Sequence, residues 1–159
     1  MLSEAVSGAR WKEQGARFVI DFALDLLADA DVAGRALYFE MRVGTGEEVR
    51  FVDLWFEGTR YELKSVRELH EYLVTGRAGA LGQFQRDVTR LLGQSEETAF
   101  DNLARLKWVF DGRRLPPDVD EAFILAQLGD WLAANEPYRS WPRLSELLDA
   151  LKGVVVVWP

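Results

Sequence analysis

Residues 49–65, VRFVDLWFEGTRYELKS, decide the fold of this chain. Two apolar runs of strand length flank Gly58-Thr59, and a glycine at the first central position favours a tight type II′ hairpin turn. Asp53 interrupts the first run, and Glu62 and Lys64 interrupt the second. Burying a charge is costly unless it pairs, binds a metal or takes part in chemistry. The hairpin therefore holds either a satisfied ion cluster or a functional site.

Side chains alternate between the two faces of a strand, so the pattern predicts which residues of the hairpin share a face. With the expected turn, Asp53 pairs with Lys64, and Glu62 shares their face. A further strand is predicted over residues 36–43, where apolar and polar residues also alternate. Its apolar residues must join the core of the hairpin, which forces Glu40 onto the face of Asp53. Four charged residues from three neighbouring strands are thus expected to converge: Glu40, Asp53, Glu62 and Lys64.

The rest of the pattern predicts one α/β domain over residues 1–159, with an antiparallel three-stranded meander that gives it α+β character. A helix is expected over about 11–30, with Asp21 and Asp25 as a solvated polar stripe. Asp118 has N-cap spacing to Glu121 and is expected to begin a helix that runs to about Asn135. The other predicted elements are a short helix or turn over 67–74, helices near 81–92 and 142–152, and strands over 106–110 and 154–158.

The composition limits the chemistry that the chain can perform. It has 159 residues, no cysteine and a single histidine, His70. Disulfides, thiolate zinc sites and cysteine nucleophiles are excluded, and so is a histidine-rich metal site. A metal here would be held by carboxylates, which favours magnesium, manganese or calcium.

The net charge of −7 is unevenly distributed along the chain. Residues 60–114 hold ten Lys or Arg and eight Asp or Glu, whereas residues 1–59 carry a net −5 and residues 115–159 a net −4. A negative net charge argues against binding to nucleic acid. The argument is weaker here, because the only net-basic third of the chain is the one that carries Glu62 and Lys64. The acidic flanks also suit a basic protein partner.

No targeting or membrane-spanning segment is predicted. No apolar run has the length of a membrane span, and the N-terminus MLSEAVSGARWKEQ has no signal-peptide core. We expect a cytoplasmic protein, or one delivered into a target cell as part of a larger effector whose targeting signal lies outside this chain. The sequence does not indicate an oligomeric state.

Two carboxylates and a lysine on adjacent strands are a combination typical of metal-dependent phosphodiester hydrolysis. The carboxylates can hold a hard cation, and the ammonium can stabilise negative charge on the phosphate. The motif is Asp53, eight residues, then Glu62-Leu63-Lys64. It resembles the signature of the PD-(D/E)XK nuclease superfamily, whose restriction-endonuclease-like core is a helix, three antiparallel strands, a helix and a fourth strand. Residues 11–110 follow that order, and residues 115–159 form a helical extension that ends in a strand.

The resemblance implies a role for each residue of the motif. It implies a magnesium or manganese ion held by Asp53, Glu62 and the backbone carbonyl of Leu63, with Lys64 assisting attack on a phosphodiester of nucleic acid, and DNA is the expected substrate. Gln85 matches a glutamine found on the helix of several branches, where it orients either the lysine or the substrate. Glu40 either adds a metal ligand or orients water.

The resemblance is strongest to the nuclease domains of bacterial polymorphic toxins, through Tyr61–Ser65 and the following Gln83–Asp87. It therefore implies an immunity protein as a partner. Val52 replaces the usual proline before the aspartate, and the acidic residue expected on the first helix has three alternatives: Glu13, Asp21 and Asp25. Basic residues available for phosphate contacts are Arg86, Arg90 and Lys107.

The alternative is a binding module on the same fold that performs no catalysis. Cross-strand charge pairs on an exposed sheet face would then explain Asp53, Glu62 and Lys64, each pair contributing about 0.2–1 kcal/mol. Its acidic surface would engage a protein partner. Phe51 and Trp55 lie on the same predicted face, which argues against full exposure of the charges.

Overall fold

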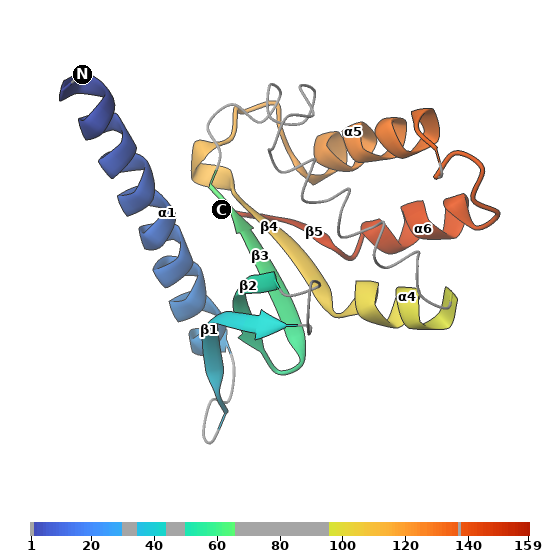
Figure 1. The fold of residues 1–159 in the computed structure, drawn as a ribbon, viewed down its shortest axis with the longest axis horizontal. Helices are drawn as coiled ribbons and strands as arrows, with labels where there is room; N and C mark the ends of the chain where they lie inside the picture. The colour runs from blue at the N-terminus through green and yellow to red at the C-terminus, as the bar shows by residue number, and fades with distance from the viewer. Residues whose placement is uncertain (1, 30–34, 44–49, 66–95, 137) are drawn as a thin grey trace.

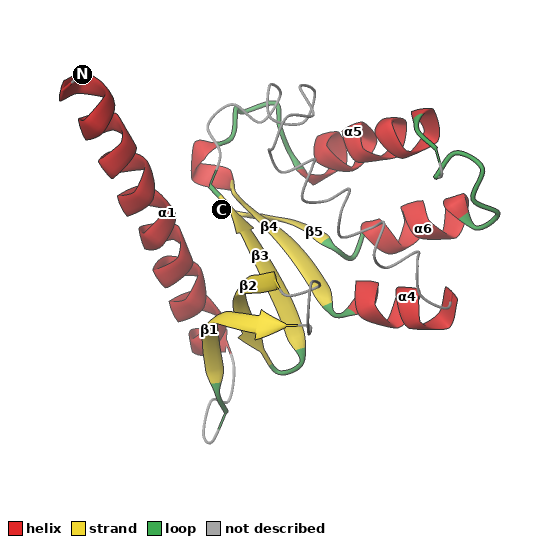
Figure 2. Ribbon diagram, viewed as in Figure 1, coloured by secondary structure: helices red, strands yellow, loops and turns green. Residues whose placement is uncertain are grey.

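The computed structural model describes residues 2–29, 35–43, 50–65, 96–136 and 138–159. They form a five-stranded mixed sheet with helices packed on its two faces (Figure 1, Figure 2). The strands, in spatial order, are β1 (Leu37–Val43), β2 (Arg50–Phe56), β3 (Thr59–Lys64), β4 (Leu106–Asp111) and β5 (Val155–Trp158). The helices are α1 (Leu2–Asp29), α4 (Glu96–Ala104), η2 (Gly112–Arg114), α5 (Glu121–Ala134) and α6 (Leu144–Leu151). The predicted α/β class is confirmed at this level.

The hairpin of β2 and β3 forms with a different turn from the predicted one. Its central residues are Glu57 and Gly58, with φ of 49° and 81°, and Phe56 pairs with Thr59. Positive φ at both central residues is the type I′ geometry, whose twist matches that of the strands. The predicted pairing of Asp53 with Lys64 is therefore wrong. The register shifts by two residues, so every side chain keeps its predicted face.

The hairpin of β1 and β2 has the predicted register. Leu37 pairs with Phe56 and Phe39 with Leu54, so these four apolar residues share one face. Phe39 nevertheless has 52% of its surface exposed, which contradicts its expected place in the core. β1 is the edge strand of the sheet, whereas α1 packs against β2 and β3, nearer its centre.

The second half of the sheet is parallel. β4 lies between β3 and β5 and runs parallel to both, with Glu62 opposite Trp108 and Trp108 opposite Val155. β3 is therefore the strand where the antiparallel meander meets the parallel half. A parallel connection requires a long crossover, and α5 and α6 lie within the one that joins β4 to β5.

One face of the sheet is covered by α1. Phe18 and Phe22, one helical turn apart, are buried against Leu63 of β3 and Val109 of β4. Ala23 packs beside them against β2. The helix begins at Leu2, well before the predicted start.

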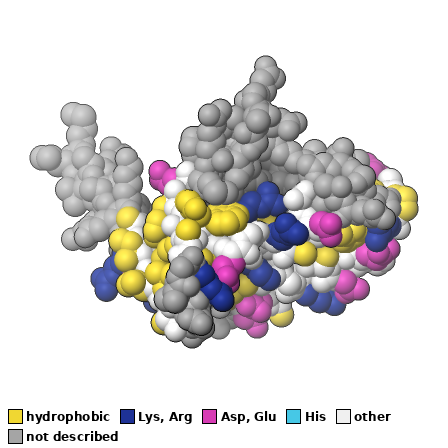
Figure 3. Space-filling model, turned by 90° about the horizontal axis from the view of Figure 1, so that it is seen from below, with side chains coloured by type: hydrophobic (Ala, Val, Ile, Leu, Met, Phe, Trp, Pro, Cys, Tyr) yellow, Lys and Arg dark blue, Asp and Glu magenta, His cyan; other side chains and the backbone are white. Residues whose placement is uncertain are grey.

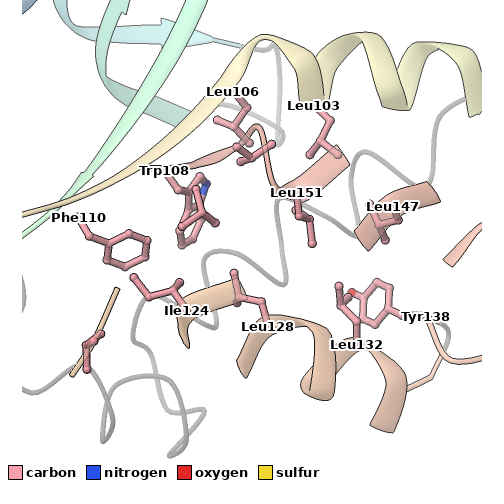
Figure 4. Packing of buried hydrophobic residues seen from close by; sticks show 13 residues of the cluster. Leu103, Leu106, Trp108, Phe110, Ile124, Leu128, Leu132, Tyr138, Leu147 and Leu151 are labelled. Carbon is pink, nitrogen blue, oxygen red and sulfur yellow. The ribbon is translucent and has the colours of Figure 1, made fainter. Parts of the chain in front are cut away.

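The opposite face of β4 and β5 is covered by α4, α5 and α6, which form the largest core cluster (Figure 4). Trp108 and Phe110 of β4 point into it, because they alternate with Val109. The helices contribute leucines and isoleucine at helical spacing: Leu103, Ile124, Leu128, Leu132, Leu147 and Leu151.

Two helix boundaries and one helix differ from the predictions. Asp120, rather than Asp118, caps α5, since its carboxylate accepts the N–H of Phe123 at 2.8 Å. α6 begins at Leu144 instead of Pro142. The pattern did not predict α4, whose nine residues are too short for a clear helical period.

Five residues, which we call the charged latch, join α1 to the ends of β4 and β5: Asp21, Asp25, Asp111, Arg113 and Trp158. Arg113 lies 2.7 Å from Asp21 of α1 and 2.7 Å from the buried Asp111 of β4. The indole N–H of Trp158 donates to Asp25 at 2.7 Å. Hydrogen bonds with Asp111 and Asp21 raise the pKa of the Arg113 guanidinium. Asp25 is exposed, as predicted for a solvated stripe, and Asp21 is partly exposed, but both carboxylates also bind residues from the other end of the chain, which the pattern did not predict.

We predict that Arg113→Ala lowers the free energy of unfolding by about 2 kcal/mol, because it leaves the buried Asp111 carboxylate without its charged donor. Arg139→Ala is the matched control, since Arg139 pairs with Glu136 in solvent and should cost about 0.5 kcal/mol or less. Urea unfolding measures both. Equal losses in the two variants would show that the latch contributes no more than a surface ion pair.

Candidate functional site

The structure brings Asp53, Glu62 and Lys64 to the face of the sheet that α1 does not cover. Leu54 and Leu63, their neighbours in the chain, pack against α1, so the alternation of the strands turns the charged residues the other way. The register of β2 and β3, continued by one pair, sets Asp53 opposite Glu62. We call the surface that carries these three residues the charged face.

Asp53 is fixed to the next strand by its side chain. Its Oδ2 accepts the backbone N–H of Leu63 at 2.7 Å. Leu63 stands between Glu62 and Lys64, so this bond ties the aspartate to the centre of the Glu-Leu-Lys triplet. A short hydrogen bond to a carboxylate is about twice as strong as one between neutral groups. The position of Asp53 relative to the triplet is therefore set by a contact that includes the backbone.

Glu62 and Lys64 are buried charges that lie beside each other. They expose 5% and 7% of their surface, and Lys64 Nζ lies 3.5 Å from Glu62 Oε2. The same ammonium stands 5.2 Å from the centre of the Trp108 ring, a cation–π contact. Both side chains lie on the charged face, since they pair with Trp108 and Phe110 of β4. Burying these two charges costs free energy, because both lose their hydration, and a buried ion pair does not always recover that loss.

The end of β3 is anchored by hydrogen bonds that the sequence did not predict. Ser65 Oγ donates to Asp111 Oδ2 at 3.2 Å, and Arg114 donates to Ser65 Oγ at 3.2 Å. Asp111 in turn accepts from Arg113. The residue that follows Lys64 is thereby connected to the charged latch. An aspartate that ends an apolar strand and is followed by Gly-Arg-Arg was the available signal.

Some predicted site residues do not join the charged face. Lys107 alternates with Trp108 on β4, so it lies on the face of α1, where its ammonium donates to the carbonyl of Gly153. Asp21 and Asp25 lie on that face too, in the charged latch. Neither Asp21 nor Asp25 can therefore meet Asp53 in this structure.

Glu40 stands at the margin of the charged face. The register of β1 and β2 places it opposite Asp53, between the pairs of Phe39 and Met41. Its φ of 47° is left-handed, which breaks the regular alternation of the strand at this residue. Its side chain is exposed. Several candidates fall outside the described residues: Gln85, Arg86, Arg90 and the side chain of Glu13.

Asp53, Glu62 and the Leu63 carbonyl suit a magnesium ion by their donor chemistry. Magnesium prefers oxygen ligands and usually takes one or two carboxylates, with water and substrate phosphate completing its shell. The described residues contain no group of three or more histidine, cysteine, aspartate or glutamate side chains that could hold a metal.

Comparison of the chain with protein-family models, with curated proteins and with solved structures finds no match. No helix in the described ranges combines the length and hydropathy of a membrane span.

We predict strong coupling between Glu62 and Lys64 in the free energy of unfolding. Lys64→Met leaves a buried glutamate without its cation and should cost about 3 kcal/mol. The double variant Glu62→Gln/Lys64→Met removes both charges and should recover at least half of that loss. Urea unfolding of wild type, both single variants and the double variant gives the coupling energy. Additive losses would mean that the two charges do not stabilise each other.

Proposed function

We propose that this chain is a magnesium-dependent nuclease that hydrolyses phosphodiesters of DNA at the charged face. The observation that carries the proposal is the bond between Asp53 and the Leu63 N–H, because it joins the aspartate to the Glu-Leu-Lys triplet across two antiparallel strands. This arrangement sets carboxylates that can hold a cation beside an ammonium that can stabilise negative charge on a phosphate. Buried charge that is not required for packing is typical of functional sites.

Each residue of the charged face has a role in the proposed reaction. Asp53 and Glu62, with the carbonyl of Leu63, would hold a magnesium ion, and the bound ion would supply polarisation of the phosphodiester and activation of the attacking water. Lys64 stabilises the negative charge that develops on the phosphate. The attacking water forms a bond to phosphorus and loses a proton to solvent, the bond to the leaving oxygen breaks, and that oxygen takes up a proton from solvent.

Trp108 and the pairing with Glu62 keep Lys64 in place before substrate arrives. The ammonium is held between a carboxylate and an aromatic ring, so a long and flexible side chain is confined near the position where it acts. Confinement before the reaction lowers the entropy lost in reaching the transition state. The residues around the motif, Tyr61–Ser65 and Gln83–Asp87, resemble those of polymorphic-toxin nucleases. We therefore extend the proposal to a toxin that is neutralised by an immunity protein.

The second candidate is a binding module with no catalysis, and the ion pair favours it. Glu62 and Lys64 neutralise each other, as two purely structural charges would. Large hydrophobic side chains are also exposed on α1 and β1, at Ile20, Leu24, Tyr38 and Phe39. Exposed apolar surface is typical of protein contacts. The module would bind a partner and leave DNA intact.

We predict that the purified protein nicks plasmid DNA with magnesium and stops when EDTA is added. Asp53→Asn should reduce the rate about 100-fold or more, since the amide carries no charge for the metal. The same amide oxygen can still accept the Leu63 N–H, so the thermal midpoint should stay near that of wild type.

Asp149→Asn is the matched control, because Asp149 is exposed and pairs only with Lys152 among the described ion pairs. It should cleave at the wild-type rate. Cleavage by Asp53→Asn at the rate of this control would exclude the proposed site. Absence of cleavage in the wild type with either magnesium or manganese would favour the binding module.

A further inference from the structure

A row of two aromatic residues and an arginine crosses the sheet beside the carboxylates. Tyr38 of β1 pairs with Trp55 of β2, and Trp55 pairs with Arg60 of β3. Residues directly opposite each other in antiparallel strands share a face. The three side chains therefore lie on the charged face, in one line across three strands. We call them the aromatic row.

The aromatic row is the immediate neighbour of the proposed catalytic residues. Trp55 follows Asp53 by two residues on β2, and Glu62 follows Arg60 by two residues on β3. Two residues along a strand cover about 7 Å, and both side chains point the same way. A ligand on the aromatic row would thus have its next chemical unit over Asp53 and Glu62.

The rings of the aromatic row are held in place and reach solvent. The centroids of Tyr38 and Trp55 are 5.3 Å apart with an interplanar angle of 63°, an edge-to-face contact. Tyr38 keeps 48% of its surface exposed, although most aromatic residues of this chain that pack in the cores are buried. One ring supports the other, so an exposed aromatic surface is presented at low cost in conformational entropy.

Arg60 adds a fixed positive charge to the aromatic row. Its guanidinium donates to the carbonyl and the side-chain oxygen of Asn102 on α4, at 3.2 and 3.3 Å. Its backbone N–H donates to the carbonyl of Arg105 at 2.8 Å. The arginine is therefore positioned from two sides. Figure 3 shows hydrophobic side chains beside Lys, Arg, Asp and Glu side chains on one face of the molecule. An aromatic ring next to a positive charge is the combination that binds a nucleic-acid strand.

We propose that Tyr38 and Trp55 stack an unpaired nucleobase, so that the charged face takes single-stranded DNA in preference to duplex. An aromatic ring stacks on the flat face of a base, and in a duplex that face is covered by the neighbouring bases. Arg60 accompanies the phosphate of the stacked nucleotide, and the next phosphate lies over Asp53 and Glu62. This substrate preference rests on the proposed nuclease function.

The test compares binding of a labelled DNA strand of about 12 nucleotides with binding of the same sequence as a duplex, by fluorescence anisotropy. EDTA is present throughout, so binding is measured without cleavage. The wild type should bind the single strand more tightly. Tyr38→Ala should weaken this binding about 10-fold or more and leave duplex binding unchanged, as expected for the loss of one base–aromatic stack. Tyr38→Phe keeps the ring and should retain the affinity.

Phe39→Ala is the matched control. Phe39 is the next residue of the same strand and is equally exposed at 52%, but its register with Leu54 puts it on the face of α1. It should bind both DNAs as the wild type does. Equal losses in Tyr38→Ala and Phe39→Ala, or tighter binding of the duplex, would overturn the proposal. Failure of both DNAs to bind would do so too, and would leave the aromatic row as a protein contact.

A cleavage assay with magnesium separates this proposal from the proposed function. Single-strand binding that depends on Tyr38, without any cleavage, would support the aromatic row and reject the nuclease. Cleavage of duplex and single strand at equal rates, unchanged in Tyr38→Ala, would support the nuclease and reject the aromatic row.

Discussion

Two buried charges on the central strand constrain the whole sheet. Glu62 and Lys64 lie on β3, where the antiparallel meander meets the parallel half. On one side of this strand Leu63 packs beneath α1, so the opposite side must carry the charges and accommodate them. The contact between Lys64 and Glu62, the Trp108 ring and the Asp53 bond to the strand provide this accommodation. A strand that needed only to be buried would carry apolar residues here, because a well-packed apolar replacement is often as stable or more so.

The faces of the sheet could be predicted from the sequence because they depend only on alternation. The predicted turn was wrong, yet the true register differs from it by two residues, and an even shift leaves each side chain on its face. Asp53, Glu62 and Lys64 were therefore grouped correctly while their pairing was not. Burial at the sheet edge was harder to predict, because the pattern of β1 cannot reveal that α1 packs nearer the centre of the sheet and leaves Phe39 exposed.

Contacts between distant parts of the chain could not be predicted from local patterns. Asp21 and Asp25 read as a solvated stripe, but Arg113 and Trp158, about a hundred residues away, bind them. Asp21 and Asp25 therefore lie on the side of the sheet opposite the charged face. The link from Arg113 through Asp111 to Ser65 also fixes the end of the strand that carries Lys64.

The central claim is that the charges of the face bind a divalent cation and do more than stabilise each other. Titration of Mn²⁺ into the protein, followed by electron paramagnetic resonance of the free ion, tests it without DNA. The account predicts a saturable site in the wild type and affinity reduced about 10-fold or more in Asp53→Asn, whose fold is retained. Absence of a site in the wild type, or equal affinity in Asp53→Asn, would contradict the account and leave Glu62 and Lys64 as a structural ion pair.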